Sequence, residues 1–81
     1  MLRRAWTLVN RNGSYHERHL HDAAWSAIYY VTSGSGATIF DDGARIVPEA
    51  GLLVMFRGHL YHRTEPADGP TPRITIAFDA S

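Results

Sequence analysis

The chain is 81 residues long, enough for one small domain near the lower size limit for a self-sufficient hydrophobic core. Its eight basic and eight acidic residues cancel, so no overall field favours nucleic acid or an anionic membrane, and we expect neither as a partner. The absence of cysteine excludes disulfides, thiolate metal sites and cysteine nucleophiles. We therefore expect a single domain over residues 1–81.

The N-terminal segment MLRRAWTLVN lacks the apolar centre of a signal peptide. No apolar run approaches the ~18 residues that a membrane-spanning helix needs. We therefore expect a soluble protein in the cytoplasm.

The first part of the chain is predicted to form two strands. Residues 4–10 (RAWTLVN) are rich in β-forming side chains, and an Asn-Gly turn dipeptide follows them. Residues 14–21 are expected to form the second strand, in which successive side chains point to opposite faces. On that strand His19 and His21 share one face, whereas His16 lies on the other.

The middle of the chain predicts three more strands. Residues 25–32 (WSAIYYVT) are the clearest, because they are mostly β-branched or aromatic. After a glycine-rich turn at residues 33–36, the segments 37–40 and 44–47 flank an Asp-Asp-Gly turn and should pair as a hairpin.

The last part of the chain begins with the apolar run at residues 52–56 (LLVMF), which we expect to be buried on both faces. A further strand carries His62. The loop at residues 65–72 contains three prolines and cannot keep a regular ladder. Residues 73–79 (RITIAFD) alternate strictly. One face of this strand carries Arg73, Thr75 and Ala77, and the other carries Ile74, Ile76 and Phe78.

No segment keeps a helical period for the ~11 residues of an average helix. Seven or eight short strands with turns about every eight to twelve residues predict an all-β fold. The expected architecture is a sandwich or a barrel, and a jelly roll is the small version that hosts metal sites.

Three histidines form the candidate metal site. His19 and His21 leave one face of one segment, and His62 joins them from about forty residues later. Imidazole is a frequent ligand for zinc, iron, copper and nickel, so the ligand type leaves the metal open. Three protein ligands on one side leave open positions, as a catalytic metal requires.

Arg73 is the candidate anion-binding residue. It lies on an otherwise apolar strand, with Thr75 two residues further on the same face. A guanidinium that faces into a barrel must be paired. An arginine beside a hydroxyl is suited to bind a carboxylate in a bidentate manner.

The ordered set of motifs resembles the iron(II)- and 2-oxoglutarate-dependent oxygenases, most closely a bacterial and phage group. That group runs W-x-x-x-N, G-x-Y/S, H-x-H, S-x-x-Y-Y-V, G-x-L-V-x-F, a histidine and R-I-x-I-x-F. The matching positions here are Trp6 and Asn10, Gly13-Ser14-Tyr15, His19-Leu20-His21, Ser26 to Val31, Gly51 to Phe56, His62, and Arg73 to Phe78.

The resemblance implies a double-stranded β-helix that converts 2-oxoglutarate to succinate while hydroxylating a second substrate, either a small molecule or a peptide. The implied iron(II) ligands are His19, His21 and His62, and the implied 2-oxoglutarate contacts are Arg73, Thr75 and either Tyr15 or Tyr30. Two positions depart from the family. Most members carry a carboxylate where this chain has His21, and related sequences usually carry a proline at position 57 instead of Arg57.

A metal-binding cupin is the alternative. Gly13 with the HxH pair, and Gly51 with His62, follow the spacing of the two cupin motifs. The cupin glutamate expected near residues 25–27 is absent, and Arg73 has no cupin role. A non-catalytic barrel that serves as a binding module is the third class, since fold does not establish activity.

The helices that usually buttress the barrel in the oxygenase family are missing here. The apolar outer face of the sheet must therefore be covered by a partner copy or remain exposed. We expect a homodimer that covers this face.

Overall fold

The computed structural model describes residues 1–34 and 36–81. Within these residues the chain forms seven strands and no helix, which confirms the all-β prediction. None of the described residues belongs to a helix with the length and apolarity needed to cross a membrane. The strands are β1 (Leu2–Asn10), β2 (Trp25–Tyr30), β3 (Thr38–Phe40), β4 (Arg45–Ile46), β5 (Leu53–Arg57), β6 (His62–Thr64) and β7 (Arg73–Ala80). The turn predicted at residues 33–36 includes Ser35, which lies outside the described residues.

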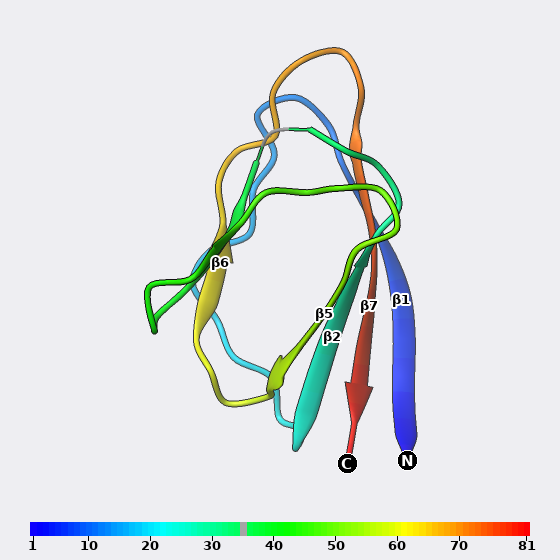
Figure 1. Ribbon diagram of the computed structural model, residues 1–81, viewed down its shortest axis with the longest axis vertical. Coiled ribbons are helices and arrows are strands. Elements are labelled where there is room, and N and C mark those ends of the chain that lie inside the picture. The colour runs from blue at the N-terminus through cyan, green and yellow to red at the C-terminus, as the bar shows by residue number, and fades with distance from the viewer. Residues whose placement is uncertain (35) are drawn as a thin grey trace.

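The strands form two antiparallel sheets that face each other (Figure 1). One sheet has the order β1-β7-β2-β5 and the other has the order β4-β3-β6. After β2 the chain passes from the large sheet to the small one, returns for β5, crosses again for β6 and returns for β7. This repeated crossing brings residues that are far apart in the sequence to the same interior, as in a jelly roll.

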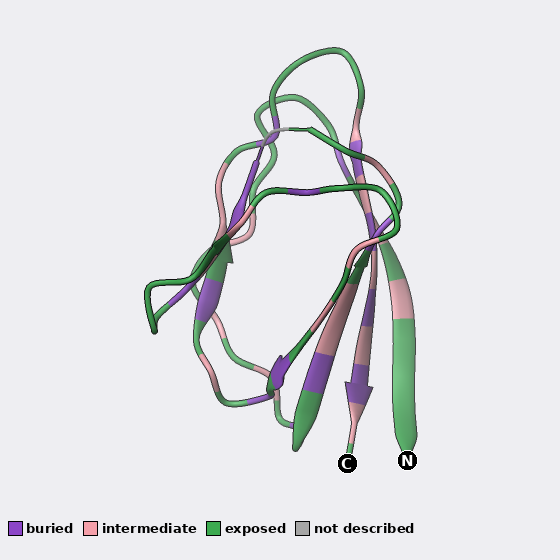
Figure 2. Ribbon diagram, in the orientation of Figure 1, coloured by how far each residue is buried: buried purple, intermediate pink, exposed green. Residues whose placement is uncertain are grey.

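Strand β7 shows which residues face that interior. Arg73, Thr75, Ala77 and Asp79 are buried, and the residues between them are only half-buried (Figure 2). The predicted alternation of this strand is therefore confirmed. Strand β7 thus presents mostly polar side chains to the interior, because three of these four inward residues carry a charge or a hydroxyl.

The outer face of the large sheet is apolar. Strand β5 lies at its edge, and Leu53 and Met55 are 52% and 64% exposed. The prediction that residues 52–56 are buried on both faces is wrong, because these two side chains point outward beside Tyr29 and Ala27 of β2. The expectation that a second copy covers this face stays a prediction.

The predicted strand at residues 14–21 is also not formed. This segment makes one isolated β-bridge, in which His19 and His62 exchange two backbone hydrogen bonds of 2.9 Å. Next to the bridge, the side-chain hydroxyl of Thr64 accepts the N–H of His16 at 2.7 Å in place of a ladder bond. Because the segment is not a regular strand, the alternation that placed His16 on the opposite face does not apply.

Candidate metal centre

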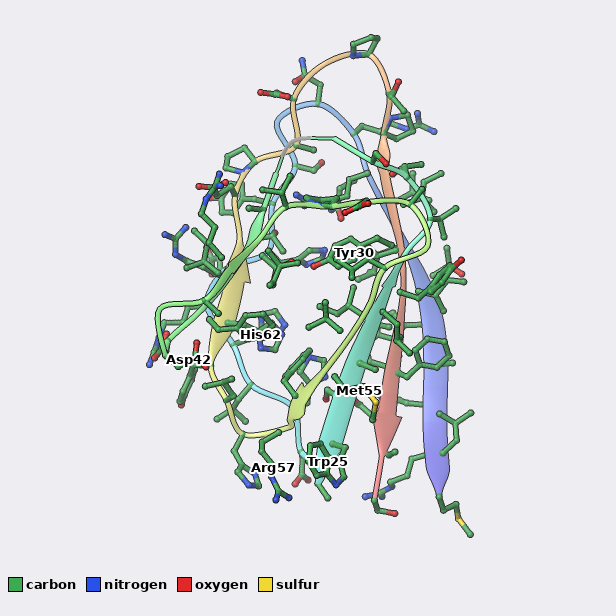
Figure 3. The ribbon with its side chains drawn as sticks, viewed as in Figure 1. Trp25, Tyr30, Asp42, Met55, Arg57 and His62 are labelled. Atoms are coloured by element: carbon green, nitrogen blue, oxygen red, sulfur yellow. The ribbon has the colours of Figure 1, made fainter. Side chains whose placement is uncertain are left out.

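Three imidazoles meet in the space between the two sheets. One ring nitrogen from each of His19, His21 and His62 lies within 4.8 Å of the others. The bridge between His19 and His62 aligns the irregular segment with β6, and the N–H of His21 donates to the carbonyl of Gly58 at 2.7 Å. Figure 3 shows His62 reaching from β6 into the interior. The structure thus brings together the three histidines that the sequence analysis selected.

The Nδ1 atom of each ring is held by an acceptor. His19 Nδ1 lies 2.6 Å from the carbonyl oxygen of Glu17, and His62 Nδ1 lies 3.0 Å from that of Leu60. His21 Nδ1 lies 3.0 Å from the Asp79 carboxylate. Since carbonyl and carboxylate oxygens only accept, Nδ1 is the donor in each contact, and Nε2 is the nitrogen that such a ring can offer to a metal ion.

The Nε2 atoms of His21 and His62 lie 3.3 Å apart. Two unprotonated nitrogens cannot hydrogen-bond to each other, and a cation between them would stabilise this separation. Two nitrogens ~2.1 Å from a single metal ion are about 3.0 to 3.4 Å apart at octahedral or tetrahedral angles. The spacing therefore fits a shared metal ion.

Burial keeps two of these rings neutral. It lowers the pKa of His62 to about 4, and the nearby His19 and His21 add to this effect while the Leu60 carbonyl opposes it. Burial also lowers the pKa of His21, although Asp79 acts in the opposite direction. Neutral imidazole is the form that binds metal, so both rings are ready as ligands at neutral pH.

Asp79 contacts His21 at Nδ1, on the side of the ring away from Nε2, and was missed by the sequence analysis. Its carboxylate also accepts the Ser26 hydroxyl at 2.8 Å and the Arg4 Nε–H at 3.1 Å. Burial raises the pKa of Asp79, but the hydrogen bonds from Ser26 and Arg4 outweigh it, so the pKa is lowered and the group is ionised. The alternation of residues 73–79 was the available signal, because it puts position 79 on the same face as Arg73.

A cavity of about 120 Å³ lies against the three histidines. Arg73 and Thr75 line it as well, so the predicted metal ligands and the predicted anion-binding residues share one space. Arg73 is only 4% exposed, and its guanidinium donates to the carbonyls of Gly36 at 2.7 Å and Glu65 at 2.9 Å. The ion pairs formed among the described residues do not include Arg73.

Neither of the two tyrosines considered as cosubstrate contacts lines the cavity. Tyr15 is 56% exposed and does not line the cavity. Tyr30 is fully buried between the sheets (Figure 3), and its hydroxyl pairs with the hydroxyl of Thr38 at 2.7 Å. Thr38 lines the cavity and Tyr30 does not.

His16 and Asn10 line the same cavity, although the sequence analysis gave neither a place in the site. Asn10 Nδ2 donates to His16 Nε2 at 3.3 Å. Burial lowers the pKa of His16, and the charges of Arg73 and His19 lower it further. A further imidazole with a lowered pKa therefore faces the interior beside the candidate metal ligands.

No protein-family profile and no curated protein sequence matches this chain. Solved structures do match. The DMSP lyase DddQ of Ruegeria pomeroyi superposes with a TM-score of 0.79 and 17% identity over 95% of this chain and 37% of its own. A Pseudomonas putida prolyl-4-hydroxylase superposes with a TM-score of 0.78 and 24% identity over 94% of this chain and 51% of its own. An RmlC-like cupin of Shewanella frigidimarina superposes with a TM-score of 0.71 and 24% identity over 95% of this chain and 65% of its own.

These likenesses place the fold with the cupin-type jelly rolls. This chain spans 37% of the length of the lyase and 51% of the length of the hydroxylase. The likenesses concern the fold alone, and the three-histidine cluster is a group that could hold a metal ion.

Proposed function

We propose that the chain is a metal-dependent oxygenase domain that binds iron(II) through His19, His21 and His62 and takes 2-oxoglutarate as its cosubstrate. The observation that carries this proposal is the position of Arg73. This buried guanidinium has no acid partner among the described residues and lines the same cavity as the three histidines. A dicarboxylate that reaches from the histidines to Arg73 supplies the missing countercharge.

The spacing of residues along β6 supports a ligand of this length. Thr64 Oγ1 accepts from Arg73 Nη2 at 3.2 Å, and Thr64 lies two residues beyond His62 on the strand. Two residues of a strand span roughly 6.5 Å, which is the scale of a short diacid rather than a monovalent anion. In this arrangement Arg73 orients the far carboxylate, assisted by Thr75, and the near end of the acid faces the histidines.

Iron(II) held in this way would supply oxygen activation coupled to decarboxylation of 2-oxoglutarate. The residues of the chain contribute binding and orientation. The Nδ1 hydrogen bonds fix the three rings, and the barrel wall limits access of water to the cavity.

The test is an anaerobic reconstitution with iron(II), followed by exposure to oxygen in the presence of 2-oxoglutarate and ascorbate. We expect succinate and carbon dioxide in equal amounts, and a loss of at least tenfold in Arg73→Met. Arg63→Met is the matched control, because Arg63 is an exposed arginine of β6 that does not line the cavity. Iron binding without 2-oxoglutarate conversion would contradict the oxygenase proposal.

A metal-binding cupin without oxygenase activity is the second candidate. The all-histidine ligand set favours it, because the third ligand is His21 rather than the carboxylate of the usual non-haem iron triad. The lyase neighbour also shows that this fold is found in a protein with another activity. Stoichiometric metal with no succinate formation selects this candidate. Absence of stoichiometric metal after reconstitution selects a non-catalytic binding module.

A further inference from the structure

Gly58 lies in the turn after β5, directly against the segment that carries His21 (Figure 1). The N–H of His21 donates to the carbonyl of Gly58 at 2.7 Å, and the N–H of Gly58 donates to the carbonyl of Ala24 at 3.1 Å. The two hydrogen bonds lie on either side of Ala23. Backbone therefore packs on backbone here, and Gly58 is buried although it belongs to a turn.

This packing leaves no room for a side chain at position 58. A Cβ atom on Gly58 would overlap the carbonyl oxygen of Ala23, and it would lie 2.7 Å from the carbonyl carbon of Ala23 and 3.2 Å from the carbonyl oxygen of His21. The backbone of Gly58 does not have the positive φ that favours glycine. Glycine is therefore required for the close approach of two backbones and not for its own conformation.

The three candidate ligands are anchored in different ways. His19 and His62 bond to each other through the isolated bridge, whereas the N–H of His21 bonds to Gly58. With a Cβ atom at position 58, the distance to the carbonyl carbon of Ala23 would have to grow from 2.7 Å to the 3.4 Å or more of an ordinary contact. Either the segment that carries His21 or the turn that leads to His62 must give way. Each of these movements separates the two rings.

The size of this movement decides its effect on the site. Groups that form a metal or catalytic site must be held within about 0.5 Å of their productive positions. The displacement required at position 58 exceeds that tolerance, and the bridge to β6 gives His19 no reason to follow. The substituted chain would therefore keep His19 beside His62 and lose the alignment of His21.

We propose that Gly58 is a positioning residue of the metal centre. It lets the backbone of His21 approach the turn closely enough for the His21 ring to meet the rings of His19 and His62, and a larger residue there leaves a centre with two ligands. The inference rests on the metal site of the proposed function and not on its cosubstrate. Gly58 does not line the cavity, so it acts through His21 and not by contact with a bound ligand.

The test substitutes Gly58→Ala. Zinc affinity is measured by competition with a chromogenic chelator, visible absorption is recorded on the cobalt(II)-loaded protein, and stability is measured by urea unfolding with EDTA present. We expect zinc affinity to fall at least tenfold and the cobalt(II) spectrum to become that of His21→Ala, because this absorption depends on the number and kind of ligands. A residue that served stability alone would leave the spectrum of the folded protein unchanged.

Gly43→Ala is the control. Its new methyl group meets open space outside the cavity, but its φ of +98° strains the backbone, so this variant loses stability without disturbing the histidines. We expect its zinc affinity to stay within twofold. On a His21→Ala background, Gly58→Ala should change zinc affinity by less than twofold, because the ring that it positions is absent. A tenfold loss on that background overturns the proposal, as does an unchanged cobalt(II) spectrum in folded Gly58→Ala.

A second measurement uses the unsubstituted protein and needs no folded variant. Positioning and metal binding are linked, so zinc should in turn protect the hydrogen bond from His21 to Gly58. We expect zinc to slow amide exchange of His21 at least tenfold more than that of Leu60, whose N–H bonds to the carbonyl of Arg57 within the same turn at 3.0 Å. Equal slowing of the two amides would mean that zinc acts through overall stability alone, and it overturns the proposal.

These outcomes separate the two proposals. If Gly58→Ala loses zinc affinity as expected and the unsubstituted protein forms no succinate, only the oxygenase proposal fails. If 2-oxoglutarate is converted and Gly58→Ala keeps its zinc affinity and cobalt(II) spectrum, only the inference about Gly58 fails. If the unsubstituted protein binds no stoichiometric metal, both proposals fail.

Discussion

The carboxylate of Asp79 lies 3.0 Å from Nδ1 of His21, so a side chain at the end of β7 orients a candidate metal ligand from the irregular segment before β2. Carboxylates in this position fix the tautomer of a ligating histidine and raise its basicity. Asp79 is itself held by Ser26 and Arg4, which leaves it little freedom to turn away.

Replacing Asp79 should therefore weaken metal binding without removing a ligand. We expect Asp79→Ala to lower zinc affinity about 10- to 100-fold, and Asp79→Asn to fall between it and the unsubstituted protein because the amide keeps an acceptor. Competition with a chromogenic chelator measures the affinity. Asp22→Ala is the control, since Asp22 adjoins His21 in the sequence but is exposed and outside the histidine cluster. Equal losses in both variants would show that Asp79 has no specific role.

Removing a ligand should have a larger effect. We expect His62→Gln to abolish stoichiometric binding of zinc or iron(II), because two imidazoles alone leave the ion without its third protein ligand. The control His59→Gln should bind one equivalent of the metal ion, since His59 is exposed in the turn before β6. Elemental analysis after gel filtration gives the stoichiometry, and far-UV circular dichroism checks that both variants fold. One full equivalent in His62→Gln would exclude the three-histidine site.

The stability of the metal-free protein should fall with acid. The pKa of His62 is about 4 in the folded chain and 6.5 when unperturbed, so between these values the unfolded state binds more protons. The contribution of His62 to the free energy of unfolding is fully present above pH 6.5 and is lost as the pH falls toward 4. From pH 7 to pH 4.5 the free energy of unfolding should drop by about 2 to 3 kcal/mol from this ring alone. Urea denaturation with EDTA present measures it, and His62→Gln should show a smaller drop.

Gly36 should tolerate no side chain, because a Cβ atom there would overlap Nη1 of Arg73. Its φ of +81° adds backbone strain, so the matched control is Gly43→Ala, which has φ +98° and open space around the new methyl group. We expect Gly36→Ala to cost about 1 to 3 kcal/mol more than the control. It should also weaken succinate binding, because the guanidinium must move. Equal stability of the two variants would place Arg73 away from Gly36 in solution.

Some of the site follows directly from sequence spacing. Arg73 and Thr75 face the cavity as expected, because a regular strand places every second side chain on one face. The same rule extended by two residues would have found Asp79. It failed for residues 14–21 because that segment forms a single bridge to β6, and an irregular backbone has no period from which the position of His16 can be read.

Burial was harder to infer than periodicity. The apolar run in β5 was expected to be covered on both faces, yet Leu53 and Met55 face outward from an edge strand. Hydrophobicity indicates that a side chain prefers to be buried. Whether another layer of the protein covers that side chain depends on how the sheets stack. For that reason the polar inner face and the apolar outer face of the large sheet appear only in three dimensions.

The sequence by itself determined the all-β class, the alternation of β7 and the choice of the three histidines, because these depend on residue type and on local backbone geometry. Only the tertiary structure decided that His16 and Asn10 line the same cavity as these histidines and that Asp79 contacts His21. The physical reason is that contacts across a jelly roll are set by the pairing of strands far apart in the chain. The Nδ1 atoms of His19 and His62 contact carbonyls only two residues away, whereas His21 Nδ1 contacts Asp79, which only this pairing brings within reach.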